Sequence, residues 1–321
     1  MDFILDLKKK VVNGYSINKE DAMELINGDS QTLASSAKEI QNFYCGDSFD
    51  FCTIVNGKSG KCSEDCKYCA QSSFYKTKVE EYPLLNTEAL KENAIKNASL
   101  GILRYSVVTS GRNLSDQEID ILCKSYKEIS KSVNIQLCAS HGLLELKQFE
   151  KLKVSGVSRY HNNLETSRRL FPSICTTHTY DEKINAIKMA KEAGLEVCSG
   201  GIIGLGETME DRIDMALELR ELGVTSVPIN ILNPIPGTPF ENIPPLSPEE
   251  IAKTIAIYRF ILPMKAIRLA GGRGLLPDKG KLAFKSGSNA AISGDMLTTS
   301  GIDISEDFKI ITDLGFKVRP L

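Results

Sequence analysis

The chain has 321 residues, of which 42% are hydrophobic and 25% are charged, and its formal net charge is −2. These values are ordinary for a soluble globular protein and allow one large barrel or two smaller domains. Acidic and basic residues are interspersed, so nothing indicates nucleic-acid binding, and no apolar stretch approaches the roughly 18 residues that a membrane span needs. The N-terminal residues are not typical of a signal or transit peptide, and we therefore expect a cytoplasmic location.

The first fifty residues are predicted to be helical. Asn18 is a suitable N-cap for the run 19–26, and another helix is expected over roughly 31–44. We interpret residues 1–50 as a helical extension that precedes a single catalytic domain, residues 51–321.

After residue 50, short apolar runs rich in β-branched residues alternate with longer amphipathic stretches. Helical periodicity covers 88–101, 181–194 and 209–223. The strand candidates are 52–57, 104–111, 135–142, 157–165, 196–207, 226–235, 266–272 and 290–297. Eight strand–helix repeats predict an α/β fold, a (β/α)8 barrel, with an open doubly wound sheet as the alternative. Both folds place functional residues at the carboxyl ends of the strands.

A cysteine-rich loop, GKCSEDCKYCAQSS, follows the first predicted strand and contains Cys62, Cys66 and Cys69. Three thiolates on one short loop can bind three irons of a cubane and leave the fourth iron open for a chelating cofactor. A zinc site needs four ligands, and the fourth would have to be Cys52 or a distant histidine. The loop contains no second CxxC pair, and the histidines at 141, 161 and 178 are too scattered for a zinc triad; we expect them at strand ends or in loops. The spacing therefore favours a 4Fe-4S cluster over zinc.

The CxxxCxYC loop resembles that of the radical S-adenosylmethionine superfamily. In that superfamily the cofactor chelates the open iron, and cluster reduction yields a 5′-deoxyadenosyl radical. Further strings, in order RYHNNLETS, TTHTYDEK, VCSGGIIGLGET, SVPINILNPIPGTP and IRLAGGR, resemble the biotin synthase family over roughly residues 40–300. The resemblance implies sulfur insertion into dethiobiotin, with an auxiliary iron–sulfur cluster as the sulfur donor. It also implies a flavodoxin or ferredoxin electron donor and a homodimer.

The same resemblance implies a site for S-adenosylmethionine, made of Tyr68, Asn163, Glu165, Lys183, Gly206 and Glu207. Asn163 and Glu165 match positions that contact the ribose, although strand-end capping would also explain them. Lys183 occupies a position where an arginine often meets the methionyl carboxylate, and lysine keeps the charge without the bidentate fork. A tight strand-to-helix turn would explain the Gly-rich run 200–207 equally well.

For the substrate, the resemblance implies that Asn163 and Asn230 bind the ureido ring, because an amide offers both a donor and an acceptor. Thr298 and Thr299 match the carboxylate site near the last strand. The alternative for both threonines is an ordinary turn.

The auxiliary cluster is where the chain departs from the family pattern of three cysteines and one arginine. Cys138, Cys198 and Arg268 match that pattern, but the remaining cysteine position holds Ser106. We expect Cys52 and Cys175 to supply the missing thiolates, so that a four-iron cluster is favoured over a 2Fe-2S cluster. A buried cysteine often serves only as a small apolar residue, and we assign Cys45 and Cys123 that role.

Two other classes of function remain open at this point. Hydrogenase-maturation and methylornithine-forming enzymes share the barrel and the cysteine loop but would not need facing cysteines inside the barrel. A zinc-stabilised binding module would be colourless and would contain stoichiometric zinc. Counting iron, sulfide and zinc separates the three possibilities.

Overall fold

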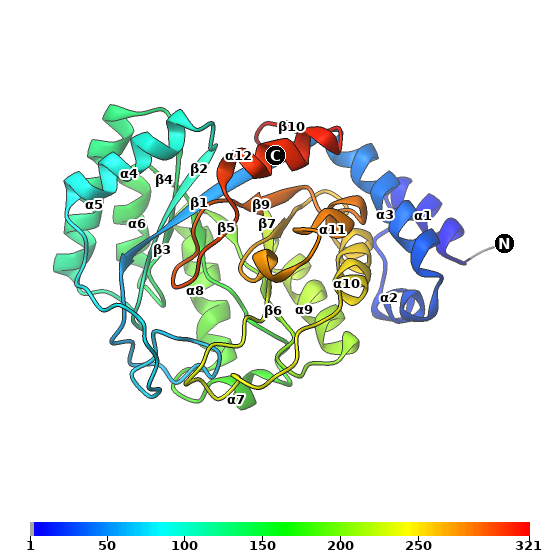
Figure 1. The fold of residues 1–321 in the computed structure, drawn as a ribbon, viewed down its shortest axis with the longest axis horizontal. Helices are drawn as coiled ribbons and strands as arrows, with labels where there is room; N and C mark the ends of the chain where they lie inside the picture. Colours follow the sequence, from blue (N-terminus) through cyan, green and yellow to red (C-terminus); the bar gives the residue numbers. More distant parts are fainter. Residues whose placement is uncertain (1–2) are drawn as a thin grey trace.

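A closed barrel of parallel strands forms the centre of the computed structural model, which describes residues 3–321 (Figure 1). Its strands are β1 (Ser48–Lys58), β2 (Arg104–Thr109), β3 (Gln136–Ser140), β4 (Val157–His161), β5 (Glu196–Cys198), β6 (Gly201–Ile203), β7 (Ser226–Ile231), β8 (Ala266–Leu269) and β9 (Ala290–Ile292). The short strands β5 and β6 both pair with β7 and together occupy one position of the barrel. Pairing of β9 with β1, with Asp50 opposite Ala290, closes the barrel. The (β/α)8 prediction is confirmed, and the doubly wound alternative is wrong.

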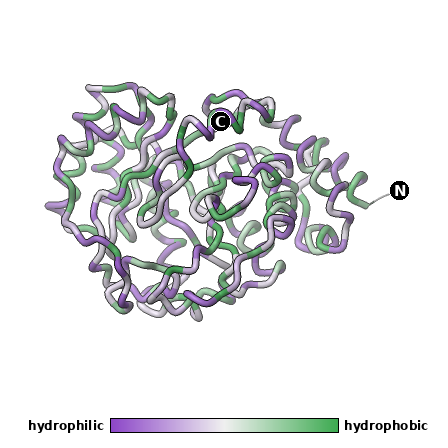
Figure 2. The backbone as a smooth tube through the Cα atoms, viewed as in Figure 1, coloured by the Kyte–Doolittle hydropathy of each residue, from purple (hydrophilic) through white to green (hydrophobic). Residues whose placement is uncertain are grey.

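An outer ring of helices covers the barrel (Figure 1). Its longer members are α4 (Thr87–Ser99), α5 (Asp116–Ser132), α6 (Leu146–Val154), α8 (Tyr180–Glu192), α9 (Met209–Glu221) and α10 (Pro248–Ile261). Reciprocal capping boxes at Ser115, Thr179 and Thr208 start three of these helices. Figure 2 shows hydrophobic and hydrophilic residues along the same outer helices, as expected when one helix face packs on a barrel. Shorter elements complete the chain: α7 (Phe171–Ile174), η2 (Arg273–Leu275), α11 (Lys281–Lys285), α12 (Ile304–Asp313) and β10 (Lys317–Val318).

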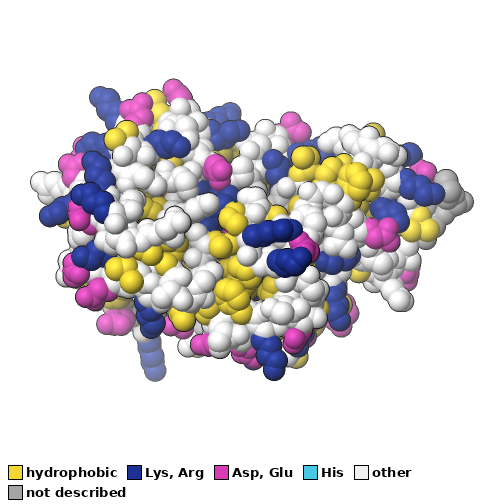
Figure 3. All heavy atoms as spheres, turned by 90° about the horizontal axis from the view of Figure 1, so that it is seen from above, with side chains coloured by type: hydrophobic (Ala, Val, Ile, Leu, Met, Phe, Trp, Pro, Cys, Tyr) yellow, Lys and Arg dark blue, Asp and Glu magenta, His cyan; other side chains and the backbone are white. Residues whose placement is uncertain are grey.

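The N-terminal segment is helical, as predicted, and lies beside α10 (Figure 1). It contains α1 (Phe3–Val12), α2 (Lys19–Glu24), η1 (Leu25–Asn27) and α3 (Ser30–Cys45). Asn18 caps α2, accepting a hydrogen bond from the Asp21 amide at 2.8 Å. None of the described helices is long and apolar enough to cross a membrane. On the face shown in Figure 3, acidic and basic side chains are mixed, without a continuous field of one sign.

The loops at the carboxyl ends of β1, β4 and β7 contact one another. The Lys67 amide donates to the carbonyl of Ile174 at 3.0 Å, which joins the loop after β1 to α7. A Cβ added to Gly237, whose φ is +88°, would lie 2.2 Å from the Lys76 carbonyl oxygen. Only glycine permits this contact between the loops after β1 and β7. The cysteine-rich loop is therefore held from two sides.

Candidate active site

The cysteine-rich loop is shaped by backbone hydrogen bonds at the end of β1. The Cys62 amide donates to the Gln71 carbonyl at 3.0 Å, and the Cys69 amide donates to the Cys66 carbonyl at 3.0 Å. The three cysteines are partly exposed and not in disulfides. Burial raises the pKa of the Cys69 thiol to about 11, so metal binding must supply the free energy that removes its proton. Three thiols on one short loop, with Cys69 lining the barrel cavity, fit an iron–sulfur cluster, for which cysteine thiolate is the usual ligand.

A cavity of about 330 Å³ leads from this loop into the barrel. Tyr68 and Cys69 line it together with Asn163, Glu165 and Asn230. An adjoining cavity of about 190 Å³ shares Tyr68 and Asn230 and extends to Thr298 and Thr299 on the loop after β9. The structure thus brings Tyr68, Asn163 and Glu165, predicted for S-adenosylmethionine, and the residues predicted for dethiobiotin to the walls of two adjoining cavities.

Three of the residues predicted to contact S-adenosylmethionine form one polar group beyond β4. The Asn163 amide donates to a Glu165 carboxylate oxygen at 3.3 Å, and Lys183 Nζ lies 3.9 Å from the other oxygen. Glu165 has a φ of +73°, an uncommon conformation for a non-glycine residue that is often found at functional sites. A Cβ on Gly201 would lie 2.4 Å from the Glu165 carbonyl oxygen, so glycine permits the approach of β6 to this turn. Burial raises the pKa of Tyr68, whose side chain contacts Glu165.

The expectation for Glu207 requires correction. Its carboxylate accepts hydrogen bonds from the amides of Gly204 at 2.7 Å and Leu205 at 2.6 Å, and it pairs with Arg212 at 2.7 Å. Only 2% of this side chain is exposed. The carboxylate therefore stabilises the Gly-rich turn from inside and is not available to a ligand. Gly206 faces open space with a φ of +93°, which fits close approach of a cofactor to the backbone.

Asn230, on β7, has hydrogen-bonding capacity left for a ligand. Its Nδ2 donates to the Gly201 carbonyl at 3.1 Å, and its Oδ1 accepts from the Gly271 amide at 2.9 Å. A primary amide has two donor hydrogens and two acceptor lone pairs, so one of each remains. The two backbone contacts fix the orientation of the amide, which faces the cavity.

Three cysteines line the deeper part of the barrel cavity: Cys52 on β1, Cys138 on β3 and Cys198 on β5. All three side chains are buried, and each lines the cavity directly. A hydrogen bond from Cys52, aided by nearby arginines, holds the pKa of Cys138 below its usual value despite burial. The predicted meeting of these thiols inside the barrel is therefore observed, with Ser106 beside Cys138 on the neighbouring strand.

Cys175 lies elsewhere, and its predicted place in this interior group requires correction. Its Sγ belongs to a group with Cys66 and His178 whose ligand atoms lie within 4.8 Å of one another. Cys175 directly follows α7, and this turn carries it over the cysteine-rich loop instead of into the barrel. The sequence placed it near the end of the fourth strand but contained no signal for the direction of its side chain.

Arg268 lines the same cavity but is already engaged by protein groups. Its Nη1 donates to the carbonyls of Asp50 and Ala291, both at 2.9 Å, and its Nη2 donates to Asp50 Oδ1 at 2.7 Å. Burial lowers the pKa of Arg268, but the nearby Asp50 carboxylate raises it by more, so the pKa lies above its usual value and the guanidinium stays protonated. A protonated guanidinium is a hydrogen-bond donor and not a metal ligand.

Two further residues of this cavity, His161 and Arg159, were not among the predicted site residues. His161 pairs in register with Cys198 and hydrogen-bonds to its thiol, which lowers the pKa of Cys198 against the effect of burial. Arg159 adds a buried positive charge that pairs with Glu196 at 2.7 Å. Both lie on β4, two residues apart, so their side chains point to the same face of the strand. This alternation was the only signal in the sequence that both face the barrel interior.

The barrel, the cysteine loop and the connected cavities define a radical S-adenosylmethionine enzyme. Residues 58–232 match the model of the Radical SAM superfamily, and residues 228–317 match that of the Biotin and Thiamin Synthesis associated domain. The chain is 59% identical to a biotin synthase of Clostridium botulinum (strain Hall) over 318 residues, covering 99% of this chain and all of that protein. It is 55% identical to a biotin synthase of Akkermansia muciniphila, with 99% of both chains covered. The chain belongs to the biotin synthase family, whose members use a 4Fe-4S cluster, S-adenosylmethionine and an auxiliary cluster.

Solved structures of other enzymes share the fold. A methylornithine synthase superposes with a TM-score of 0.86 at 19% identity, covering 98% of this chain and 97% of that one. An FeFe-hydrogenase maturase from Carboxydothermus hydrogenoformans gives 0.82 at 19% identity, with 98% and 78% covered. At this identity the likeness concerns the fold alone. Because the full-length relatives are biotin synthases, two alternatives are set aside. One is a hydrogenase-maturation or methylornithine-forming enzyme, and the other is a zinc-stabilised binding module.

Proposed function

We propose that this chain converts dethiobiotin to biotin by radical insertion of sulfur, with the auxiliary cluster as sulfur donor. One observation carries the proposal: a single cavity runs from Cys69 past Asn230 to the buried thiols of Cys52, Cys138 and Cys198. A substrate held at Asn230 lies between the loop where the radical arises and the group that donates sulfur.

The following predicted residues have a task in this scheme. Cys62, Cys66 and Cys69 bind the 4Fe-4S cluster, which together with S-adenosylmethionine supplies the 5′-deoxyadenosyl radical. Glu165 and Lys183 orient the cofactor through its ribose and its carboxylate. Asn163 and Asn230 hold the ureido ring by the donor and acceptor that each amide retains. Thr298 and Thr299 receive the substrate carboxylate at the outer cavity.

The auxiliary cluster in this proposal has four irons and is held by Cys52, Cys138 and Cys198. Three thiols around one cavity match the ligand number that the cysteine-rich loop offers its own cluster. Arg268 has one N–H left after its bonds to Asp50, Ala291 and Ser226, and that N–H is a donor toward cluster sulfur.

The decisive experiment is an anaerobic turnover assay of the reconstituted protein with dethiobiotin, S-adenosylmethionine and a low-potential reductant. We expect biotin together with two 5′-deoxyadenosines per biotin, because two C–H bonds are opened. Formation of 5′-deoxyadenosine without biotin, at saturating dethiobiotin, would contradict the proposal.

We also propose a flavodoxin or ferredoxin as the electron donor, a homodimer, a cytoplasmic location and a single catalytic domain over residues 51–321. The chemistry requires a one-electron donor of low potential, and the homodimer rests on the family resemblance. The location and the domain bounds are those expected from the sequence. Turnover with purified donors and sedimentation of the reconstituted protein test the first two.

A further inference from the structure

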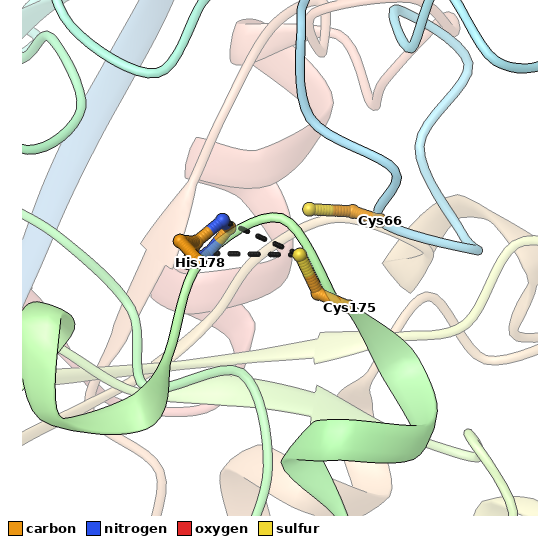
Figure 4. A group of neighbouring side chains, drawn as sticks. All are labelled: Cys66, Cys175 and His178. Carbon is orange, nitrogen blue, oxygen red and sulfur yellow. Dashed lines mark hydrogen bonds between the residues drawn. The ribbon is translucent and has the colours of Figure 1, made fainter.

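The buried thiol of Cys175, which does not line the barrel cavity, lies next to the thiol of Cys66. Figure 4 shows Cys66 of the cysteine-rich loop facing Cys175 and His178 of the turn after α7. The sulfur atoms of Cys66 and Cys175 are within 4.8 Å of each other, and Cys175 is 3% exposed. His178 Nδ1 lies 3.3 Å from Cys175 Sγ and also contacts a carboxylate oxygen of Glu64.

Two carboxylates between Cys62 and Cys66 hold this turn in place. Asp65 Oδ1 accepts from the Thr176 amide at 2.8 Å and the Thr177 amide at 3.2 Å. Glu64 Oε2 accepts from Thr177 Oγ1 at 2.8 Å and lies 3.5 Å from Arg112 Nη1. The position of Cys175 relative to Cys66 is therefore fixed by contacts on both sides.

Besides Cys66, three groups near Cys175 Sγ could accept the hydrogen of its thiol: Asp65 Oδ1, His178 Nδ1 at 3.3 Å and Thr177 Oγ1 at 3.4 Å. His178 Nδ1 is engaged by the Glu64 carboxylate, and Thr177 Oγ1 is a neutral hydroxyl oxygen that already accepts from the Asp65 amide at 3.2 Å. Cys175 Sγ lies 3.2 Å from Asp65 Oδ1, but two backbone amides already donate to that oxygen, which has two lone pairs. Once Cys66 binds iron as a thiolate, it becomes a negatively charged acceptor with free lone pairs. The better acceptor for the remaining donor is then the sulfur of Cys66.

We propose that Cys175 is a positioning residue whose thiol donates a hydrogen bond to the cluster-bound sulfur of Cys66 and raises the reduction potential of the 4Fe-4S cluster. Reduction adds negative charge to the cluster, so a donor to a ligand sulfur stabilises the reduced state more than the oxidised state. Hydrogen bonds to ligand sulfurs are among the factors that set such potentials. The inference requires the 4Fe-4S cluster and S-adenosylmethionine but not the identity of the substrate.

The other possible role for Cys175 is that of a ligand. Thiolates bound to different irons of a cubane lie farther apart than two ligands of one ion, which are about 3.7 Å apart for sulfur ligands of a tetrahedral metal. The short separation of Cys66 and Cys175 does not suit a fourth corner of the same cubane. A single ion shared with His178 would have to take Cys66 from the cluster.

The test is a potentiometric titration of the S-adenosylmethionine-bound cluster, monitored by electron paramagnetic resonance. Cys175→Ala should shift the midpoint potential to a more negative value. Cys175→Ser keeps a hydrogen-bond donor, so its potential should lie between those of Cys175→Ala and the wild type. Cys123→Ala is the matched control, because Cys123 is also a buried thiol but lies on the outer helix α5. It should leave the potential unchanged.

Iron content, measured in parallel, separates the two roles of Cys175. We expect equal iron per chain in the wild type and Cys175→Ala. Loss of about four irons in Cys175→Ala would make Cys175 a ligand and overturn the inference. An unshifted potential with full iron content would overturn it as well. Neither measurement depends on biotin formation, so a failed turnover assay leaves this test readable.

Discussion

Arg268 and Asp50 form a buried ion pair beneath the barrel cavity, with Nη2 and Oδ1 2.7 Å apart and the side chains 3% and 0% exposed. Arg104 Nε contacts the other oxygen of the same carboxylate at 3.0 Å. One acid thus holds two guanidiniums that face the thiols of Cys52 and Cys138. The arrangement places positive charge next to the thiols of Cys52 and Cys138, which become negatively charged thiolates when they bind iron.

Replacing Asp50 with Ala should destabilise the protein by about 3–5 kcal/mol, because two buried guanidiniums would lose their partner. Urea unfolding of the wild type and variant measures this. Asp47→Ala is the control: Asp47 also pairs with an arginine, Arg319, but the two side chains are 34% and 51% exposed. An exposed pair contributes far less to stability than a buried one, so equal losses in the two variants would contradict the interpretation.

Changing Cys62, Cys66 or Cys69 to Ala should each abolish cleavage of S-adenosylmethionine. A cluster missing one thiolate ligand no longer presents a single open iron to the cofactor. Chromatographic measurement of 5′-deoxyadenosine after anaerobic reconstitution tests this, with Cys123→Ala as the control. Near-normal product from any of the three loop variants would show that its cysteine is not a required ligand.

Asn230→Ala should weaken dethiobiotin binding by about 1–3 kcal/mol, roughly five- to a hundred-fold in affinity, because the ureido ring loses a buried partner. Isothermal calorimetry with S-adenosylmethionine present measures the dissociation constant. Iron content should stay at the wild-type value, which serves as the control for folding. An unchanged dissociation constant would show that Asn230 has only a structural role, through its two backbone contacts with Gly201 and Gly271.

The apolar periodicity of the sequence predicted the barrel strands and the helical N-terminus, because it reports which side chains face the interior. The meeting of Cys138 with Cys198 was implied by the family resemblance. The sequence did not predict the position of Cys175, since the direction of a turn after a four-residue helix depends on tertiary contacts such as those of Asp65. Glu207 was misjudged for a related reason. Its carboxylate is consumed by a pair formed with Arg212, five residues further along the chain, and that pairing is visible only in three dimensions.

The last prediction separates Cys52 from Cys175. If the auxiliary cluster has four irons held by Cys52, Cys138 and Cys198, the reconstituted wild type contains about eight irons per chain. Cys52→Ser should then lose about four irons and its biotin yield, while cleavage of S-adenosylmethionine continues at the separate loop cluster. Cys175→Ser should retain all its iron, because its Sγ lies beside Cys66 and not in the barrel cavity. Iron analysis with Mössbauer spectroscopy measures both the number and the type of centre. About six irons, unchanged by Cys52→Ser, would instead establish a two-iron centre at Cys138 and Cys198. In that case Cys52 would be a packing residue, and Arg268 would have to leave Asp50 to become a ligand.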